Sequence, residues 1–129
     1  AQDFINKNSL EHRAKMYPGD IWDSPFPDAD IHFYSQIFHD WPLEKCEFLA
    51  QKSYQSLPQG GQIILHEKLL NDNKDGPFAV TAASIAMLLW TEGKQYSGKE
   101  LKELLKRVGF KNITIQSGFG YFSVVCGEK

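Results

Sequence analysis

The chain has 129 residues, a length that suits a single domain. Hydrophobic residues make up 42% of it and aromatic residues 13%, which indicates a packed core rather than a disordered chain. A formal net charge of −2, without a run of Lys and Arg, argues against a general nucleic-acid-binding protein, and no apolar stretch approaches the roughly 20 residues that span a bilayer.

The first predicted elements are a helix over residues 1–10 and a short strand over residues 13–17. A loop rich in Pro and Asp follows over residues 23–30. Residues 31–38 (IHFYSQIF) carry β-branched and aromatic side chains on both faces, which predicts a strand buried on both sides. A His-Asp pair, residues 39–40, comes directly after this strand.

The next segment has the pattern of an amphipathic helix. Pro42 suits a first helical turn, and the residues at spacings of three and four behind it are apolar or small, namely Cys46, Leu49, Ala50, Ser53 and Leu57. Residues 58–61 (PQGG) end this helix. Residues 63–65 then predict a second short buried strand, with Glu67 at its end.

The C-terminal half predicts two helices and a strand pair. Residues 78–90 are nearly all apolar or small, so we expect a helix that is buried on most sides or faces a pocket. Ser97 and Glu100 have the spacing of a capping box at the start of a helix that Gly109 ends. Residues 113–116 and 121–126 follow as a strand pair, and the order of elements favours a mostly parallel sheet with an antiparallel edge.

Two cysteines, Cys46 and Cys126, lie on apolar faces of a predicted helix and a predicted strand. Buried free thiols are the favoured interpretation, and they fit a reducing cytoplasm. A disulfide between them is an open alternative without positive support.

Two side chains stand where an open α/β sheet builds its binding site, outside the carboxyl ends of the strands. His39 follows the first buried strand and Glu67 ends the next. A neutral His39 is suited to accept a proton, and a carboxylate such as Glu67 can hold the useful tautomer of an imidazole. The alternatives are a histidine bonded to the backbone and a surface acid that caps a strand. His32 and His66 are interpreted as packing or surface residues, and without HExxH or CxxC we expect no metal site.

Four motifs in order, GDIW at residues 19–22, FHDW at 38–41, GGQIILHE at 60–67 and TEGKQYS at 91–97, resemble the S-adenosylmethionine-dependent small-molecule O-methyltransferases. The acetylserotonin and caffeic-acid O-methyltransferase group is the most similar. The resemblance implies an α/β fold, the C-terminal portion of a Rossmann-like class I methyltransferase sheet. This chain would supply strands three to seven, mostly parallel with an antiparallel C-terminal edge.

The resemblance also implies roles for individual residues. His39 would be the general base toward a small aromatic or phenolic hydroxyl, with Glu67 as the residue that orients it. Cofactor-binding positions would be Gly19, Asp20, Ile21, Ser35, Gln36 and Trp41, although Ser35 and Gln36 stand where relatives carry Lys or Arg, and Trp41 can equally be a packing residue. Substrate-binding positions would be Met87, Trp90 and Gln95; core packing is the favoured alternative for Met87, and many relatives have Glu in place of Gln95.

The resemblance covers only part of the family's domain. No GxGxG occurs in the chain, and the first two strands, the acidic residue after the second strand and the N-terminal dimerisation domain of the family have no counterpart. We therefore expect residues 1–129 to be a partial catalytic domain, inactive in isolation, whose edge strand is covered by another copy in a homo-oligomer or by a missing N-terminal half. The alternative is an inactive half-domain that acts in protein interaction.

Overall fold

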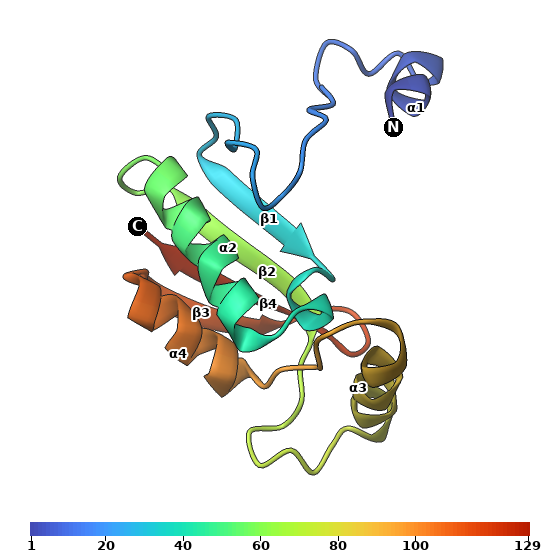
Figure 1. The fold of residues 1–129 in the computed structure, drawn as a ribbon, viewed down its shortest axis with the longest axis vertical. Helices are drawn as coiled ribbons and strands as arrows, with labels where there is room; N and C mark the ends of the chain where they lie inside the picture. The colour runs from blue at the N-terminus through green and yellow to red at the C-terminus, as the bar shows by residue number, and fades with distance from the viewer.

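The computed structural model describes all 129 residues and contains one mixed four-stranded sheet with helices around it (Figure 1). The elements in chain order are α1 (Gln2–Lys7), β1 (Ile31–Ser35), the 3₁₀ turn η1 (Phe38–Asp40), α2 (Leu43–Ser56), β2 (Gln62–Lys68), α3 (Phe78–Trp90), α4 (Gly98–Val108), β3 (Lys111–Ser117) and β4 (Phe122–Glu128).

The strand order is β1-β2-β4-β3, and only β1 and β2 are parallel. The expectation of a mostly parallel sheet is therefore wrong, because β4 returns between β2 and β3 and runs antiparallel to both. The strand expected at residues 13–17 is also absent, since this segment has no neighbouring strand with which to exchange hydrogen bonds. The chain thus supplies four strands rather than five.

Helices α2 and α4 pack side by side on one face of the sheet (Figure 1). The alternation of buried residues in β2 places Ile63 and Leu65 on this face, where they meet the apolar stripes of the two helices. The predicted capping box is present at the start of α4: the Ser97 hydroxyl accepts the N–H of Glu100, and the Glu100 carboxylate accepts the N–H of Ser97. Each fully buried aliphatic side chain here contributes about 1.5–3 kcal/mol to folding.

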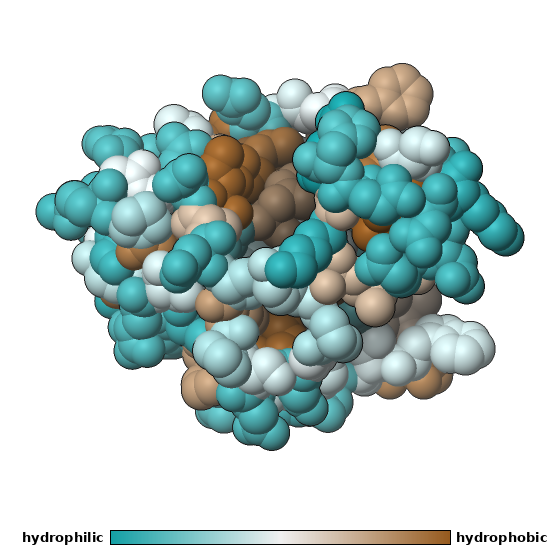
Figure 2. Space-filling view, turned by 90° about the horizontal axis from the view of Figure 1, so that it is seen from above, coloured by the Kyte–Doolittle hydropathy of each residue, from teal (hydrophilic) through white to brown (hydrophobic).

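The opposite face of the sheet carries a row of aromatic rings. His66 of β2 stacks between Phe33 of β1 and Phe122 of β4, with ring centroids 6.1 and 4.6 Å apart. β1 lies at the edge of the sheet, as expected, but the expectation that this strand is buried on both sides is wrong, because Ile31 and Phe33 are 51% and 60% exposed. Figure 2 shows apolar side chains open to solvent in a hollow of the molecular surface.

Helix α3 has the bounds that the sequence predicts, but the first of the two expectations for it, burial on most sides, is wrong. Only Val80 of this helix is buried, and its large apolar side chains are exposed, namely Phe78, Ile85, Leu88, Leu89 and Trp90. Figure 1 shows this helix to one side of the sheet, and the Ser84 hydroxyl on it accepts the N–H of Gln95. The structure has no helix with the length and apolar character that a bilayer crossing requires.

Candidate active site

The site forms where the chain leaves β1. The sequence predicts a strand to Phe38, but β1 ends at Ser35. The Gln36 N–H still bonds to the carbonyl of His66 on β2, and the positive φ of Gln36, 55°, then turns the chain out of the strand. The next two backbone N–H groups, of Ile37 and Phe38, donate to Glu67 Oε1 at 3.0 and 2.9 Å. The Glu67 carboxylate on β2 thus fixes the backbone at the start of the 3₁₀ turn η1.

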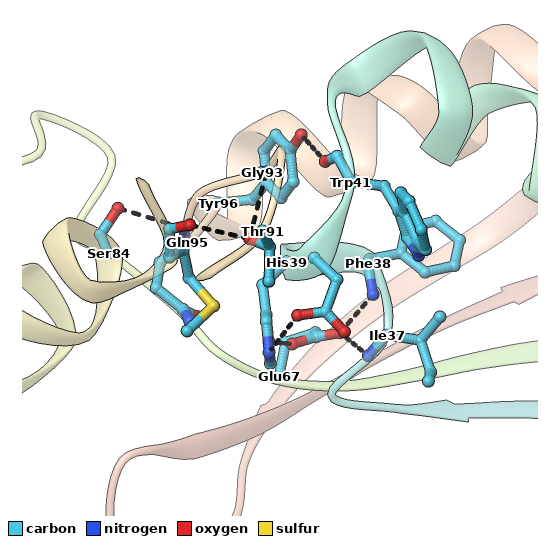
Figure 3. Close-up of polar contacts among 12 residues, drawn as sticks. Ile37, Phe38, His39, Trp41, Glu67, Ser84, Thr91, Gly93, Gln95 and Tyr96 are labelled. Atoms are coloured by element: carbon cyan, nitrogen blue, oxygen red, sulfur yellow. Dashed lines mark hydrogen bonds and ion pairs between the residues drawn. The ribbon is translucent and has the colours of Figure 1, made fainter. Parts of the chain in front are cut away.

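This turn brings His39 onto Glu67, as Figure 3 shows. His39 Nδ1 lies 2.6 Å from Glu67 Oε2, and the two side chains are only 11% and 3% exposed. With Nδ1–H donating to the carboxylate, a neutral His39 keeps the lone pair on Nε2, which is the atom that can accept a proton. Asp40 Oδ1 lies 3.4 Å from that Nε2. The structure brings together the two residues that the sequence separated by 28 positions.

The charges around His39 change its pKa in a defined direction. Burial lowers the pKa, whereas the hydrogen bond to Glu67 and the negative charges of Glu67 and Asp40 raise it, and Lys68 opposes them. The net result is a pKa above the ordinary value of 6.5. The pair is therefore suited to accept a proton and to hold the resulting imidazolium.

The connection between α3 and α4 lies directly over this turn. Glu92 N–H donates to the Asp40 carbonyl at 3.2 Å, and the Tyr96 hydroxyl donates to the Trp41 carbonyl at 2.7 Å. Gln95, in the same connection, is 2% exposed, and its amide oxygen has no hydrogen-bond partner. The sequence interpretation named Gln95 but missed Tyr96, although both stand in the TEGKQYS motif.

The first three of the expected cofactor-binding residues line a separate hollow. Gly19, Asp20 and Ile21 belong to the wall of a cavity of about 590 Å³ formed by residues 17–21 and 24–27. Asp20 Oδ1 accepts the N–H of Trp22, while Oδ2 makes no hydrogen bond. An apolar wall with an available carboxylate oxygen fits a flat heteroaromatic ring that carries an amino group. No glycine-rich loop is available in this chain for the rest of such a cofactor.

An aromatic contact joins this loop to the His39 turn. Trp41 meets Trp22 edge to face, with centroids 4.8 Å apart, and Lys45 Nζ lies 4.6 Å from the Trp41 ring. Lys52 of α2 donates to the carbonyls of Ile21 and Trp22, at 2.7 and 3.1 Å. The expected cofactor loop and the expected base are therefore held to the same helix, α2.

The remaining expected site residues are more scattered. Ser35 points to the open sheet face, where its hydroxyl lies 2.9 Å from His66 Nδ1, and Gln36 is exposed. Trp90 is 81% exposed on α3, and Met87 of the same helix is half-buried.

Two further predictions concern the state of the cysteines and the histidines outside the site. Both cysteines are free, Cys46 buried and Cys126 half-buried. The two ring nitrogens of His32 are buried without partners. No group of three His, Cys, Asp or Glu side chains is placed to bind a metal ion.

Comparison with known proteins gives a consistent result. Residues 1–111 match the O-methyltransferase domain family. The acetylserotonin O-methyltransferase of Gallus gallus is 34% identical over 119 residues, which are 92% of this chain and 34% of that protein. The acetylserotonin O-methyltransferase of Homo sapiens is 28% identical over the same shares of the two chains. This chain thus spans about a third of the length of the relatives that it matches.

Solved structures agree with the fold. An O-methyltransferase family 2 protein from Planctomyces limnophilus, in complex with apigenin, superimposes with a TM-score of 0.93 at 29% identity over 98% of this chain and 39% of that one. Human N-acetylserotonin methyltransferase in complex with SAM gives a TM-score of 0.85 at 25% identity, over 94% of this chain and 37% of that one. The matched region is the C-terminal part of these larger proteins.

Proposed function

Because this chain belongs to the O-methyltransferase domain family, we propose that it forms the acceptor-activating part of an S-adenosylmethionine-dependent enzyme that methylates an aromatic or phenolic hydroxyl of a small molecule. The observation that carries this proposal is the buried contact of 2.6 Å between His39 and Glu67 at the ends of β1 and β2. The likeness to structures that hold SAM and apigenin supports the choice of cofactor and substrate class.

The chemistry of such a transfer defines what the chain's residues do. S-adenosylmethionine supplies a methyl group on a positively charged sulfur. His39 Nε2 would take the proton of the acceptor hydroxyl, which would make its oxygen a stronger nucleophile toward the methyl carbon. Glu67 holds the Nδ1–H tautomer and stabilises the imidazolium that forms, as the acid does in a Ser-His-Asp triad.

The cofactor site is divided in this proposal. Asp20 Oδ2 would accept a hydrogen bond from the adenine amino group, and Ile21, in the wall of the same cavity, would pack on the ring. Trp41 would flank the adenine through its contact with Trp22. Ser35 and Gln36 supply polar atoms where relatives place a cation. A glycine-rich loop has to come from outside residues 1–129, so these residues act as one part of a catalytic domain. The coding sequence upstream provides a simple check, since a GxGxG motif after a strand supports this arrangement.

Titration calorimetry of S-adenosylhomocysteine into the 129-residue chain tests the cofactor site. We expect micromolar binding only if another copy completes the site, and Asp20→Ala then weakens it by about tenfold, the value of one lost hydrogen bond to a charged group. Asp28→Ala in the same loop is the matched control and leaves binding unchanged. Binding that Asp20→Ala does not weaken contradicts the adenine role, and an absence of binding contradicts a complete site in the isolated chain.

The role of His39 has its own test. In any assembly of this chain that transfers methyl groups, His39→Ala lowers turnover by roughly 10²-fold or more, with little change in cofactor affinity. Unchanged turnover contradicts the assignment of the base. Gln95, Met87 and Trp90 contact the acceptor in this proposal, so their substitution changes KM before it changes cofactor binding.

A second candidate function, a non-catalytic half-domain that binds a partner chain, is favoured by one observation. β1 is an unpaired edge strand whose Ile31 and Phe33 are 51% and 60% exposed. Such an edge offers free backbone groups to another strand. If the chain has the solution mass of a monomer and does not bind S-adenosylhomocysteine, these results favour a half-domain whose edge strand lacks its partner over a complete enzyme.

A further inference from the structure

The turn that carries His39 is held at its two ends by different parts of the chain. At its start, Glu67 Oε1 accepts the N–H groups of Ile37 and Phe38. At its end, the carbonyl of Trp41 accepts the hydroxyl of Tyr96 at 2.7 Å. Tyr96 is 3% exposed, so this hydrogen bond is made away from competing water.

The connection between α3 and α4 lies so close to the turn at Gly93 that no space remains for a side chain. Gly93 is buried, and a Cβ at this position would overlap the carbonyl oxygen of His39 and lie 2.5 Å from the backbone nitrogen of Trp41. Real Cβ atoms do not occupy such positions, so one of the two backbones has to move if the residue is larger than glycine. The φ of Gly93 is not in the left-handed region, so the requirement for glycine is one of space.

The buried thiol of Cys46 also contacts the turn. Cys46 Sγ lies 3.1 Å from the carbonyl of Phe38 and 3.5 Å from that of Trp41, and the Tyr96 hydroxyl is 4.0 Å away. Cys46 is fully buried. The carbonyls at both ends of the 3₁₀ turn therefore have side-chain donors, and Tyr96 provides the shorter contact.

We propose that Tyr96 and Gly93 are positioning residues for His39: the Tyr96 hydroxyl and the close approach at Gly93 fix the turn in the place where the imidazole meets Glu67. Neither residue touches the reacting atoms in this arrangement. The catalytic meaning of the inference rests on the proposed function, but the positioning itself concerns only the geometry of His39 and Glu67. Both can therefore be tested separately.

Tyr96→Phe is the decisive variant, because it keeps the buried ring and removes only the hydroxyl. The Trp41 carbonyl then loses its short hydrogen bond, and the turn is free to shift relative to β2. The groups that set the protonation of His39 are Glu67 and Lys68 on β2 and Asp40 on η1, and the contact with Glu67 is the closest. A longer contact lowers the pKa of His39 toward the value that burial alone gives.

The experiment is an NMR titration of the four histidine side chains in the full 129-residue chain, with His39→Gln to assign the signal. We expect Tyr96→Phe to lower the pKa of His39 by about half a unit or more, and to leave that of His32 unchanged. Gly93→Ala acts in the same direction. Tyr54→Phe is the matched control, because the Tyr54 hydroxyl makes no hydrogen bond and its ring packs edge to face on Phe110.

If Tyr96 only stabilises the fold, Tyr96→Phe melts at a lower temperature while His39 titrates as it does in the wild type. This outcome overturns the proposal. If Gly93→Ala does not fold, the result for Tyr96→Phe alone decides whether the proposal holds. Gly76→Ala is the control for the loss of a glycine, because a Cβ at residue 76 meets atoms no closer than 3.5 Å. The titration needs no cofactor. A shifted His39 in a chain that fails to bind S-adenosylhomocysteine thus supports the positioning and contradicts only the complete cofactor site.

Discussion

Glu67 contacts both the imidazole of His39 and the backbone that leads into it. Its Oε2 lies 2.6 Å from His39 Nδ1, and its Oε1 accepts two N–H groups of the preceding residues. Both oxygens of a carboxylate that is 3% exposed are therefore satisfied. Because the same side chain orients the ring and builds the turn, its charge and its shape have separate consequences.

Glu67→Gln separates these two roles, since the amide keeps the shape and one acceptor oxygen but removes the charge. We expect the pKa of His39 to fall, because the negative charge of Glu67 no longer opposes the effect of burial and Asp40 is then the only acid that does. The wild-type pair stabilises the fold below pH 6.5 and loses this contribution as the pH rises through the raised pKa of His39. The variant should lose about 1–3 kcal/mol at pH 6.

The measurement is urea unfolding at pH 6 and pH 9, together with the NMR titration of His39. Glu92→Gln is the control, because Glu92 also pairs with a cation, Lys45, but is 59% exposed, where an ion pair contributes little. Equal losses for Glu67→Gln at the two pH values would show that the imidazolium does not contribute.

Local sequence pattern predicts those parts of the fold that local forces decide. The capping box at Ser97 and Glu100 is present because both partners lie within one helical turn. The end of β1 was predicted three residues too late, because the interaction that ends it comes from Glu67 on another strand. The approach at Gly93 has the same character, since only the folded chain places this residue against His39.

The predicted strand orientation is wrong because the pairing of strands depends on residues that lie far apart in the sequence. A run of strands and helices indicates an α/β fold but does not tell which neighbour the last strand selects, and β4 selects β2 and β3 in antiparallel orientation. Helix α3 has the expected bounds but not the expected burial. Its bounds follow from local composition, whereas its burial depends on surfaces that residues 1–129 do not place over it.

His32 provides a pH dependence of the opposite sign to that of His39. Both of its ring nitrogens are buried without partners, its ring meets Phe26 edge to face, and burial lowers its pKa below 6.5. The neutral ring is therefore the form that the fold accepts. This contribution to stability is present above pH 6.5 and is lost as the pH falls through and below 6.5, because the unfolded chain takes up the proton first.

We expect His32→Phe to remove part of the acid sensitivity between pH 7 and pH 5, and to raise stability by about 1 kcal/mol at pH 5.5, since no buried donor or acceptor is then left unpaired. Urea midpoints at both pH values measure this change. His12→Gln, at an exposed position, should leave the acid sensitivity as it is. A His32→Phe chain with unchanged acid sensitivity contradicts the assignment.

The α4 capping box predicts a loss of stability at lower pH. Burial raises the pKa of Glu100, but hydrogen bonds from Lys74, Lys94 and the N–H of Ser97 outweigh it and bring the pKa to about 2. The stabilisation is complete above the ordinary value of 4.5 and is lost as the pH falls from 4.5 toward 2.

Ser97→Ala should cost about 1 kcal/mol at pH 7, the usual value of a lost helix N-cap. Glu100→Gln should remove most of the stability change below pH 4.5, as measured by thermal unfolding across pH 2–6. Glu103→Gln, on the exposed side of the same helix, is the control. If Glu103→Gln changed the acid transition as much as Glu100→Gln, net charge rather than the cap would be responsible.

The open edge of β1 predicts that this chain associates in solution. Phe33 is 60% exposed beside backbone groups that no strand pairs, and such edges bind other strands. Phe33→Lys places a charge on this edge, so we expect the average mass measured by light scattering to fall toward that of the monomer. Phe119→Lys is a matched control, because Phe119 is 95% exposed in the β3–β4 loop and not on a strand. Equal effects of both substitutions would assign the association to general surface hydrophobicity, and a wild-type chain that is monomeric at every concentration would contradict the prediction outright.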